Sequence, residues 1–100
     1  MKSKVYISGK ISGMEYSVAC SFFDNAEAHL IDEGFDTINP TKITHEHDLS
    51  WENYMKTDIK AMMGCTHIYM LHNWEESRGA IIEHNLAKEL GFVIMYNKIN

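Results

Sequence analysis

The chain contains few cysteines and no long apolar run. Its two cysteines, Cys20 and Cys65, are too few and too far apart for a disulfide framework or a thiolate zinc site, so we expect both to stay reduced. No apolar segment reaches the roughly 18 residues that span a membrane, and the N-terminus has no apolar signal-peptide region. We therefore expect a cytoplasmic protein without a membrane partner.

Basic residues are also sparse. Nine Lys and Arg residues against 14 Asp and Glu residues give a formal net charge of −5, and the basic residues form no block. A surface for duplex nucleic acid or for an anionic membrane needs clustered basic side chains, so we expect neither partner. A small anionic ligand stays compatible with this charge, because a helix N-terminus and one or two nearby cations can bind it locally.

The length and the apolar pattern predict one domain over residues 1–100. One hundred residues suit a single hydrophobic core, and no repeat, low-complexity tract or linker divides them. Apolar segments typical of strands cover residues 4–8, 35–38, 67–71 and 92–96. Segments with helical spacing of apolar residues cover 16–33, 51–63 and 77–90, and residues 41–50 are predicted to form a loop.

This order of elements predicts an α/β fold. Nearly all-apolar strands that alternate with helices indicate a parallel sheet covered on both faces. We expect a reduced doubly wound, flavodoxin- or Rossmann-like three-layer sandwich with a four-stranded parallel sheet in the order 2-1-3-4. Ligands in such sheets bind beyond the carboxyl ends of the strands, where the order reverses. Gly9, Asn39 and His72 are therefore expected to converge there.

The segment after the first strand, residues 8–13 (SGKISG), has features of an anion-binding loop. Its two glycines allow backbone N–H groups to approach an anion, and its two hydroxyls can add hydrogen bonds. Neither the Walker spacing nor a dinucleotide fingerprint is present, and an ordinary strand-to-helix turn explains the same residues. Ser77 is expected to cap the third helix, where free N–H groups suit a phosphate; a simple serine cap is the common alternative.

Two carboxylates stand out on helical segments. Glu83 lies four residues from small side chains in both directions, on a helix side where a carboxylate is rare unless it is paired or functional. If Ile81 and Ile82 form the buried stripe instead, Glu83 is exposed. Asp58 lies on the apolar-leaning face of the preceding helix, where an ion pair with Lys60 is the ordinary alternative.

The histidines do not form a recognisable metal motif. Residues 45–48 (HEHD) place two histidines at i,i+2 in a loop, with His72 and His84 elsewhere. Zinc hydrolases use the i,i+4 helical spacing instead. We expect no metal and no cofactor.

Three segments resemble the nucleoside 2-deoxyribosyltransferase-like superfamily, in the form of its small domains from phages and bacteria. They are residues 5–13 (VYISGKISG), 51–65 (WENYMKTDIKAMMGC) and 73–91 (NWEESRGAIIEHNLAKELG). The nearest functional parallel is the 2′-deoxynucleoside 5′-phosphate N-hydrolase branch. In that branch an aromatic residue of the first strand precedes a Gly-Ser-Ile-Arg-Gly-like loop, similar to Tyr6 and residues 9–13.

Further along the chain, the resemblance extends to the acids. In the branch the catalytic glutamate follows the serine of a Ser-x-Gly turn by six residues, the spacing that Ser77 and Glu83 keep. A second acid, matched by Asp58, lies in the helix before the third strand. The chain departs from the superfamily at Thr66, where an aspartate is usual, and at Ser77, where the nucleoside transferases have an aspartate. A serine at the second position binds the 5′-phosphate in the phosphate-specific branch, which implies a nucleotide substrate.

The resemblance implies a nucleotide N-glycosidase or deoxyribosyltransferase that acts on a (deoxy)nucleoside 5′-monophosphate. It implies Glu83 as nucleophile, Asp58 as the group that assists proton transfer to the leaving base, and Tyr6 as the residue that orients Glu83. Trp74 is expected either to stack on the base or to cap the edge of the core. The substrate-binding residues expected on this basis are Gly9, Lys10, Ile11, Ser12, Gly13, Asn39, Trp74, Ser77, Arg78 and Gly79.

Two other classes of function stay open: a nucleotide-binding module without turnover and a structural homo-oligomer. We also expect the enzyme itself to be a dimer-based homo-oligomer, with the partner closing the site and the tail 96–100 reaching it. The helix over 51–63 carries more large apolar side chains than one side of a four-stranded sheet needs. The alternative is that these side chains fill the monomer's own core. They are Trp51, Tyr54, Met55, Met62 and Met63.

Overall fold

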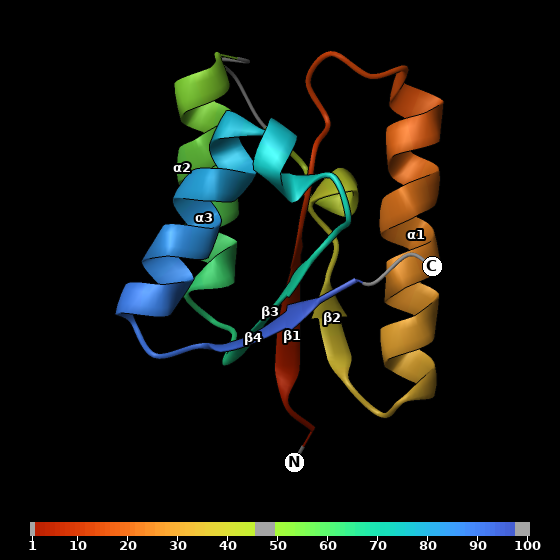
Figure 1. Ribbon diagram of the computed structural model, residues 1–100, viewed down its shortest axis with the longest axis vertical. Coiled ribbons are helices and arrows are strands. Elements are labelled where there is room, and N and C mark those ends of the chain that lie inside the picture. The colour runs from red at the N-terminus through yellow and green to blue at the C-terminus, as the bar shows by residue number, and fades with distance from the viewer. Residues whose placement is uncertain (1, 46–49, 98–100) are drawn as a thin grey trace.

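A parallel four-stranded sheet forms the centre of the molecule in the computed structural model, which describes residues 2–45 and 50–97 (Figure 1). The strand order is β2-β1-β3-β4, and all three neighbouring pairs are parallel, so the predicted topology is confirmed. The strands are β1 (Lys4–Ser8), β2 (Asp36–Ile38), β3 (His67–Met70) and β4 (Val93–Tyr96). The predicted strands over 35–38, 67–71 and 92–96 each differ from these bounds by one residue.

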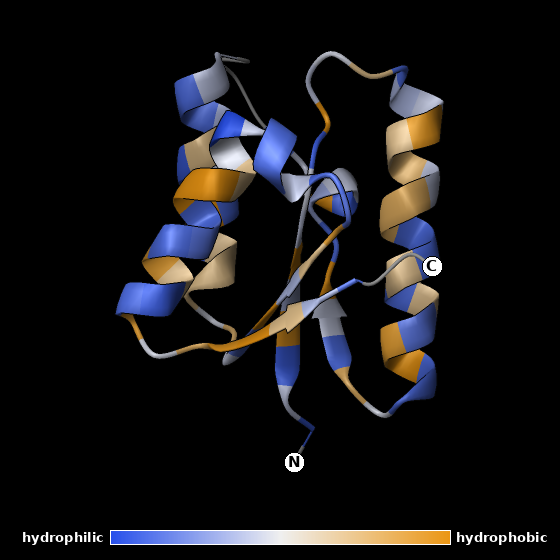
Figure 2. Ribbon diagram, viewed as in Figure 1, coloured by the Kyte–Doolittle hydropathy of each residue, from blue (hydrophilic) through white to orange (hydrophobic). Residues whose placement is uncertain are grey.

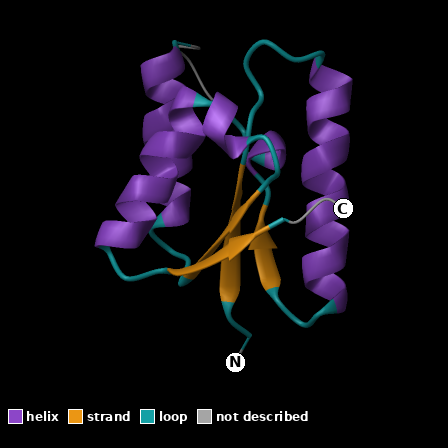
Figure 3. Cartoon of the chain, in the orientation of Figure 1, coloured by secondary structure: helices purple, strands orange, loops and turns teal. Residues whose placement is uncertain are grey.

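Helices cover both faces of the sheet and complete the three layers. The long helix α1 lies on one face, and α2 and α3 lie together on the other (Figure 1). Figure 3 shows the same arrangement, with the strands between the two helical layers. The helices are α1 (Tyr16–Asp32), α2 (Trp51–Met62) and α3 (Arg78–Glu89), with short 3-10 turns at η1 (Pro40–Lys42) and η2 (Trp74–Glu76).

The alternation of side chains along β1 divides the core into two clusters. Val5 and Ile7 pack with residues of α1, whereas Tyr6, between them, packs with residues of α2 and α3. The cluster on the α1 side also includes Phe23, Leu30 and Leu71. The opposite cluster also includes Met62, Ile68, Met70 and Ala80. Each fully buried large side chain contributes about 1.5–3 kcal/mol to the free energy of unfolding. The helices of both layers carry hydrophilic as well as hydrophobic residues, as expected of helices with one buried side (Figure 2).

The helix ends follow the local signals in the sequence. Ser50 and Ser77 cap α2 and α3, since their hydroxyl oxygens accept from the backbone N–H groups of Asn53 and Ala80, both at 3.2 Å. After α1, Gly34 adopts φ 95°, a left-handed conformation that favours glycine and stops the helix. Among the described residues, no helix has the length and apolarity that a membrane span requires.

Candidate active site

A cavity of about 580 Å³ opens beyond the carboxyl end of β1. Its walls come from the end of β1 and the loop after it, the segment after β2, and parts of α1, α2 and α3. The cavity lies where the strand order reverses between β1 and β3, which is the position expected for a ligand. The volume lies in the range of small-molecule sites, roughly 300–1,000 Å³.

Glu83 is buried at this cavity and is held by two hydroxyl groups. Its side chain, in the second turn of α3, is only 5% exposed, whereas Ile81 and Ile82 are 37% and 38% exposed. The Tyr6 hydroxyl donates to Glu83 Oε2 at 2.8 Å, and the Ser8 hydroxyl donates to Oε1 at 2.7 Å. The expected burial of Glu83 is therefore confirmed, and both of its carboxylate oxygens have a donor.

The surroundings of Glu83 change its protonation. Burial raises the pKa of Glu83 to about 7, although the hydrogen bonds from Ser8 and Tyr6 oppose the rise and the negative charge of Asp58 adds to it. Burial, and then the neighbouring Glu83, raise the pKa of Tyr6 well above its usual value, so the phenol stays a donor. Near neutral pH this site holds a carboxyl group that exchanges its proton, a property typical of catalytic acids.

A second buried acid, Asp58 of α2, lines the same cavity. Its Oδ1 lies 2.8 Å from Nε2 of His45, so its partner is a histidine of the segment after η1 and not Lys60. The His45 ring in turn stacks on Tyr54 with ring centroids 4.2 Å apart. Burial raises the pKa of Asp58, while the contact with His45 opposes the rise.

The histidine-rich segment forms no metal site within the described residues. His45 faces Asp58, and no group of three or more His, Cys, Asp or Glu side chains that could hold a metal ion occurs in residues 2–45 and 50–97. The other members of the segment, residues 46–48, lie outside the described residues.

The loop after β1 contributes only part of the predicted ligand set. Gly9, Ile11 and Ser12 line the cavity. Lys10 does not line it, because its N–H donates to Asn73 Oδ1 at 3.1 Å and its ammonium group faces Glu76 at 3.7 Å. Gly13 also lies outside the lining, at a turn with φ 83°.

Packing explains why residue 9 is a glycine. A Cβ atom at Gly9 would lie 2.6 Å from Leu71 Cδ1, too close for any real contact. The chain therefore passes against the end of β3 only if this position has no side chain. The glycine has a structural reason that is independent of an anion.

The N-terminus of α3 reaches the cavity through Ser77 and Gly79. Ser77 acts as the expected cap, and its hydroxyl hydrogen stays available for a ligand. At Gly79 a Cβ atom would meet Met55 Sδ at 2.8 Å, so the glycine lets α3 pack closely on α2. Arg78 is outside the lining because its guanidinium group lies over the Trp51 ring, 4.0 Å from the centroid.

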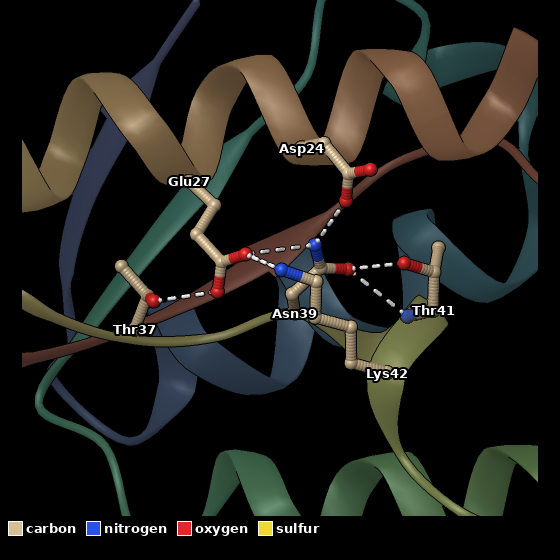
Figure 4. A network of polar contacts seen from close by, with 6 residues as sticks. All are labelled: Asp24, Glu27, Thr37, Asn39, Thr41 and Lys42. Atoms are coloured by element: carbon tan, nitrogen blue, oxygen red, sulfur yellow. Dashed lines mark hydrogen bonds and ion pairs between the residues drawn. The ribbon is translucent and has the colours of Figure 1, made fainter.

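Asn39 is held in a network of contacts with other protein residues (Figure 4). It does not line the cavity. Its amide nitrogen donates to Asp24 Oδ1 at 2.9 Å and to Glu27 Oε1 at 3.4 Å, and its oxygen accepts from Thr41 N at 3.0 Å and from the Thr41 hydroxyl at 2.6 Å. Lys42 adds an ion pair with Glu27. The network connects η1 to α1. Asn39, which was expected to bind the substrate, therefore fixes one wall of the site instead.

Two other residues expected at the site, Trp74 and His72, lie outside the cavity. Trp74 stacks on His84 with centroids 4.2 Å apart, and His84 Nε2 lies 2.8 Å from the Tyr96 hydroxyl, so Trp74 is taken up by a cluster outside the cavity. His72 packs edge-on against Phe22 on the α1 side. The aromatic side chains that line the cavity include Tyr16, Trp51 and Tyr54.

The two residues that hold the carboxylates of the site, Ser8 and His45, were not predicted in that role. Ser8 carries a signal that was available, since it follows Tyr6 by two residues and a strand sends such pairs to the same face. His45 carries none, because its contact with Asp58 joins a loop to a helix 13 residues away.

Comparison with known families adds one finding. The model of the family described as Domain of unknown function (DUF4406) matches residues 3–96, which contain every cavity residue named above. No curated protein matches the chain.

Proposed function

This chain belongs to the DUF4406 family, and we propose that it cleaves the N-glycosidic bond of a (deoxy)nucleoside 5′-monophosphate. The observation that carries the proposal is Glu83, a buried carboxylate at a ligand-sized cavity, held by two hydroxyl donors and accompanied by a second acid. The resemblance of the sequence to nucleoside 2-deoxyribosyltransferase-like domains supports the same reaction. The product is a free base together with either a sugar phosphate or a transferred glycosyl group.

Glu83 is the nucleophile in this proposal. Its ionised form attacks the anomeric carbon through an oxocarbenium-like transition state and forms a glycosyl-enzyme, which water or another base resolves. Tyr6 and Ser8 orient the two oxygens of Glu83. A pKa of about 7 leaves a substantial ionised fraction at neutral pH, and the hydroxyl donors stabilise that form.

The 5′-phosphate is assigned to the N-terminus of α3. The Ser77 hydroxyl and the free backbone N–H groups there suit an anion, and the helix dipole favours negative charge at this end. None of the described residues that line the cavity is a lysine or an arginine. Ser77 and the N–H groups therefore carry the recognition of the phosphate.

The departure from the superfamily at Thr66 does not weaken the proposal. Thr66 precedes β3, at the end of the sheet opposite the cavity, and its hydroxyl oxygen lies 2.8 Å from His67 Nδ1. The substitution therefore removes no acid from the cavity.

Turnover decides between an enzyme and a binding module. The protein is incubated with ribo- and deoxyribonucleoside 5′-monophosphates, and released base is measured by chromatography. We expect release by the parent and a loss of about 10³-fold or more in Glu83→Gln, as for other covalent nucleophiles. The exposed Glu89→Gln on the same helix is the matched control. Nucleotides that bind without any release of base would favour the module without turnover.

A homodimer with α2 at its interface is part of the proposal. Tyr54 and Met63 are 37% and 45% exposed, whereas Met62 is fully buried in the monomer's own core and contributes nothing to a partner. A partner on this face would cover the cavity edge formed by Trp51 and Tyr54. Residues 98–100 of the tail expected to reach the partner lie outside the described residues.

Sedimentation equilibrium tests the dimer. We expect a mass of twice 11.5 kDa for the parent and a shift toward the monomer in Tyr54→Arg. The control is Ile31→Arg, on the exposed surface of α1. A parent that is active and sediments as a single species of 11.5 kDa would rule the dimer out.

A further inference from the structure

We infer that His45, held by Asp58, is the catalytic residue that protonates the leaving base. The inference rests on the proposed N-glycosidase function and deepens it. It moves the proton from Asp58, where the family resemblance puts it, to the imidazole, and it makes Asp58 a positioning residue.

The geometry of the pair carries the inference. His45 and Asp58 both line the cavity, their side chains are only 13% and 12% exposed, and Nε2 lies 2.8 Å from Oδ1. Tyr54, one turn before Asp58 on α2, supports the imidazole from one face. The ring is therefore held from two directions by a single helix, which fixes its orientation as a catalytic acid requires.

The second ring nitrogen is available for the substrate. Nδ1 of His45 has no hydrogen-bond partner among the described residues, whereas Nε2 is engaged by Asp58. A carboxylate bonded to one nitrogen of a histidine fixes the tautomer and stabilises the imidazolium, as in Ser-His-Asp triads. The proton on Nδ1 is then the one that a ligand in the cavity meets.

Among the described residues, the titratable groups around the pair are acids and phenols. The titratable groups that share the cavity lining are the acids Asp58 and Glu83 and the phenols Tyr6, Tyr16 and Tyr54. No lysine or arginine occurs in the described part of the lining. Glu83 is used as the nucleophile, and histidine is a side chain suited to giving a proton and taking it back, so His45 is the remaining cavity group for this role.

The proposed steps balance. Nδ1–H of the imidazolium gives its proton to a ring nitrogen of the base while the electrons of the glycosidic bond move onto the base. The Glu83 carboxylate bonds to the anomeric carbon, and His45 becomes neutral. Water then attacks that carbon, His45 takes the proton of the water, and Glu83 leaves as a carboxylate. The cycle returns His45 and Glu83 to their starting states.

The test compares two leaving groups in His45→Gln. An ordinary purine nucleotide needs a proton on the departing base, whereas an N7-methylated purine nucleotide leaves without one. We expect kcat/KM to fall by about 10²-fold or more on the first substrate, as for a lost general acid, and by only about threefold on the second. His72→Gln removes a histidine outside the cavity and should change neither value.

The outcomes separate this inference from the proposed function. Equal losses on both substrates, or no loss on either, overturn the role of His45 while the N-glycosidase stands. A parent that releases no base from any nucleotide overturns the proposed function and, with it, the inference. If His45→Gln does not fold, or if the parent rejects the methylated substrate, Asp58→Asn and the pH profile decide. In the parent, kcat/KM should fall at alkaline pH, and in Asp58→Asn this fall should occur at a different pH. An unchanged pH profile overturns the inference.

Discussion

Glu83→Gln should make the protein more stable above neutral pH while it abolishes the proposed reaction. The substitution keeps the size of the side chain and removes its charge. The unfolded chain ionises Glu83 near its ordinary pKa of 4.5, whereas the folded protein does so at about 7. Between these values the folded state binds more protons than the unfolded state, so the contribution of Glu83 to stability is lost as pH rises.

The magnitude follows from the same two pKa values. Their difference corresponds to about 3 kcal/mol by which ionisation of Glu83 lowers the unfolding free energy. This loss is small near pH 4.5 and complete above about pH 8. Hydrogen bonding adds little to this difference, because a glutamine can still accept from Tyr6 or Ser8 through its oxygen. Relative to the parent, Glu83→Gln should therefore gain stability progressively across this window.

Urea unfolding of both proteins at about pH 5 and about pH 8.5 measures the effect. The difference in unfolding free energy between variant and parent should grow by about 2–3 kcal/mol between these two conditions. Asp58 is present in both proteins, so its own pH dependence largely cancels in the difference. Glu89→Gln on the surface of α3 should differ from the parent by less than about 0.5 kcal/mol at either pH.

A difference that stays constant with pH would refute the reasoning. It would mean that Glu83 ionises in the folded protein as easily as in the unfolded chain, in spite of its burial. The pKa of Glu83 would then not be raised, and the proposal that Glu83 is a functional acid would lose its physical basis.

Three further predictions concern the walls of the cavity. Ser77→Ala should weaken binding of a nucleoside 5′-monophosphate by about 1.5–3 kcal/mol, the cost of a hydrogen bond to a charged group, and leave binding of the nucleoside nearly unchanged; calorimetry that finds equal losses would make Ser77 only a cap. Asn39→Ala should lower the unfolding free energy by about 1–3 kcal/mol, because it removes the hydrogen bonds that the buried Asn39 amide makes to α1 and η1; an unchanged urea midpoint would contradict this. Gly9→Ala should cost about 1–3 kcal/mol through its clash with Leu71; in Gly9→Ala with Leu71→Ala the two costs should be less than additive, and strict additivity would argue against the contact.

The sequence alone determined the elements of the fold and the burial of Glu83. Short apolar segments, apolar spacings of three to four residues, the serine caps and the glycine stops are local signals that act within one strand or helix. They predicted the four strands, the three long helices and, through the rule that links parallel strands by crossovers, the order β2-β1-β3-β4. Glu83 was predicted correctly for the same reason, since its neighbours four residues away are the small residues of the buried face.

Only the tertiary structure decided which polar side chains meet. Asn39 was expected to face a ligand, yet it pairs with α1. Trp74 was expected either to stack on a base or to cap the edge of the core, and it stacks on His84 and packs against the core cluster. His45 was considered only with a metal, yet it contacts Asp58. In each case the deciding contact joins segments at least ten residues apart, and it depends on the course of a loop between them. Periodicity carries no information on that course, because a loop has no repeating pattern and its conformation is chosen by the packing that surrounds it.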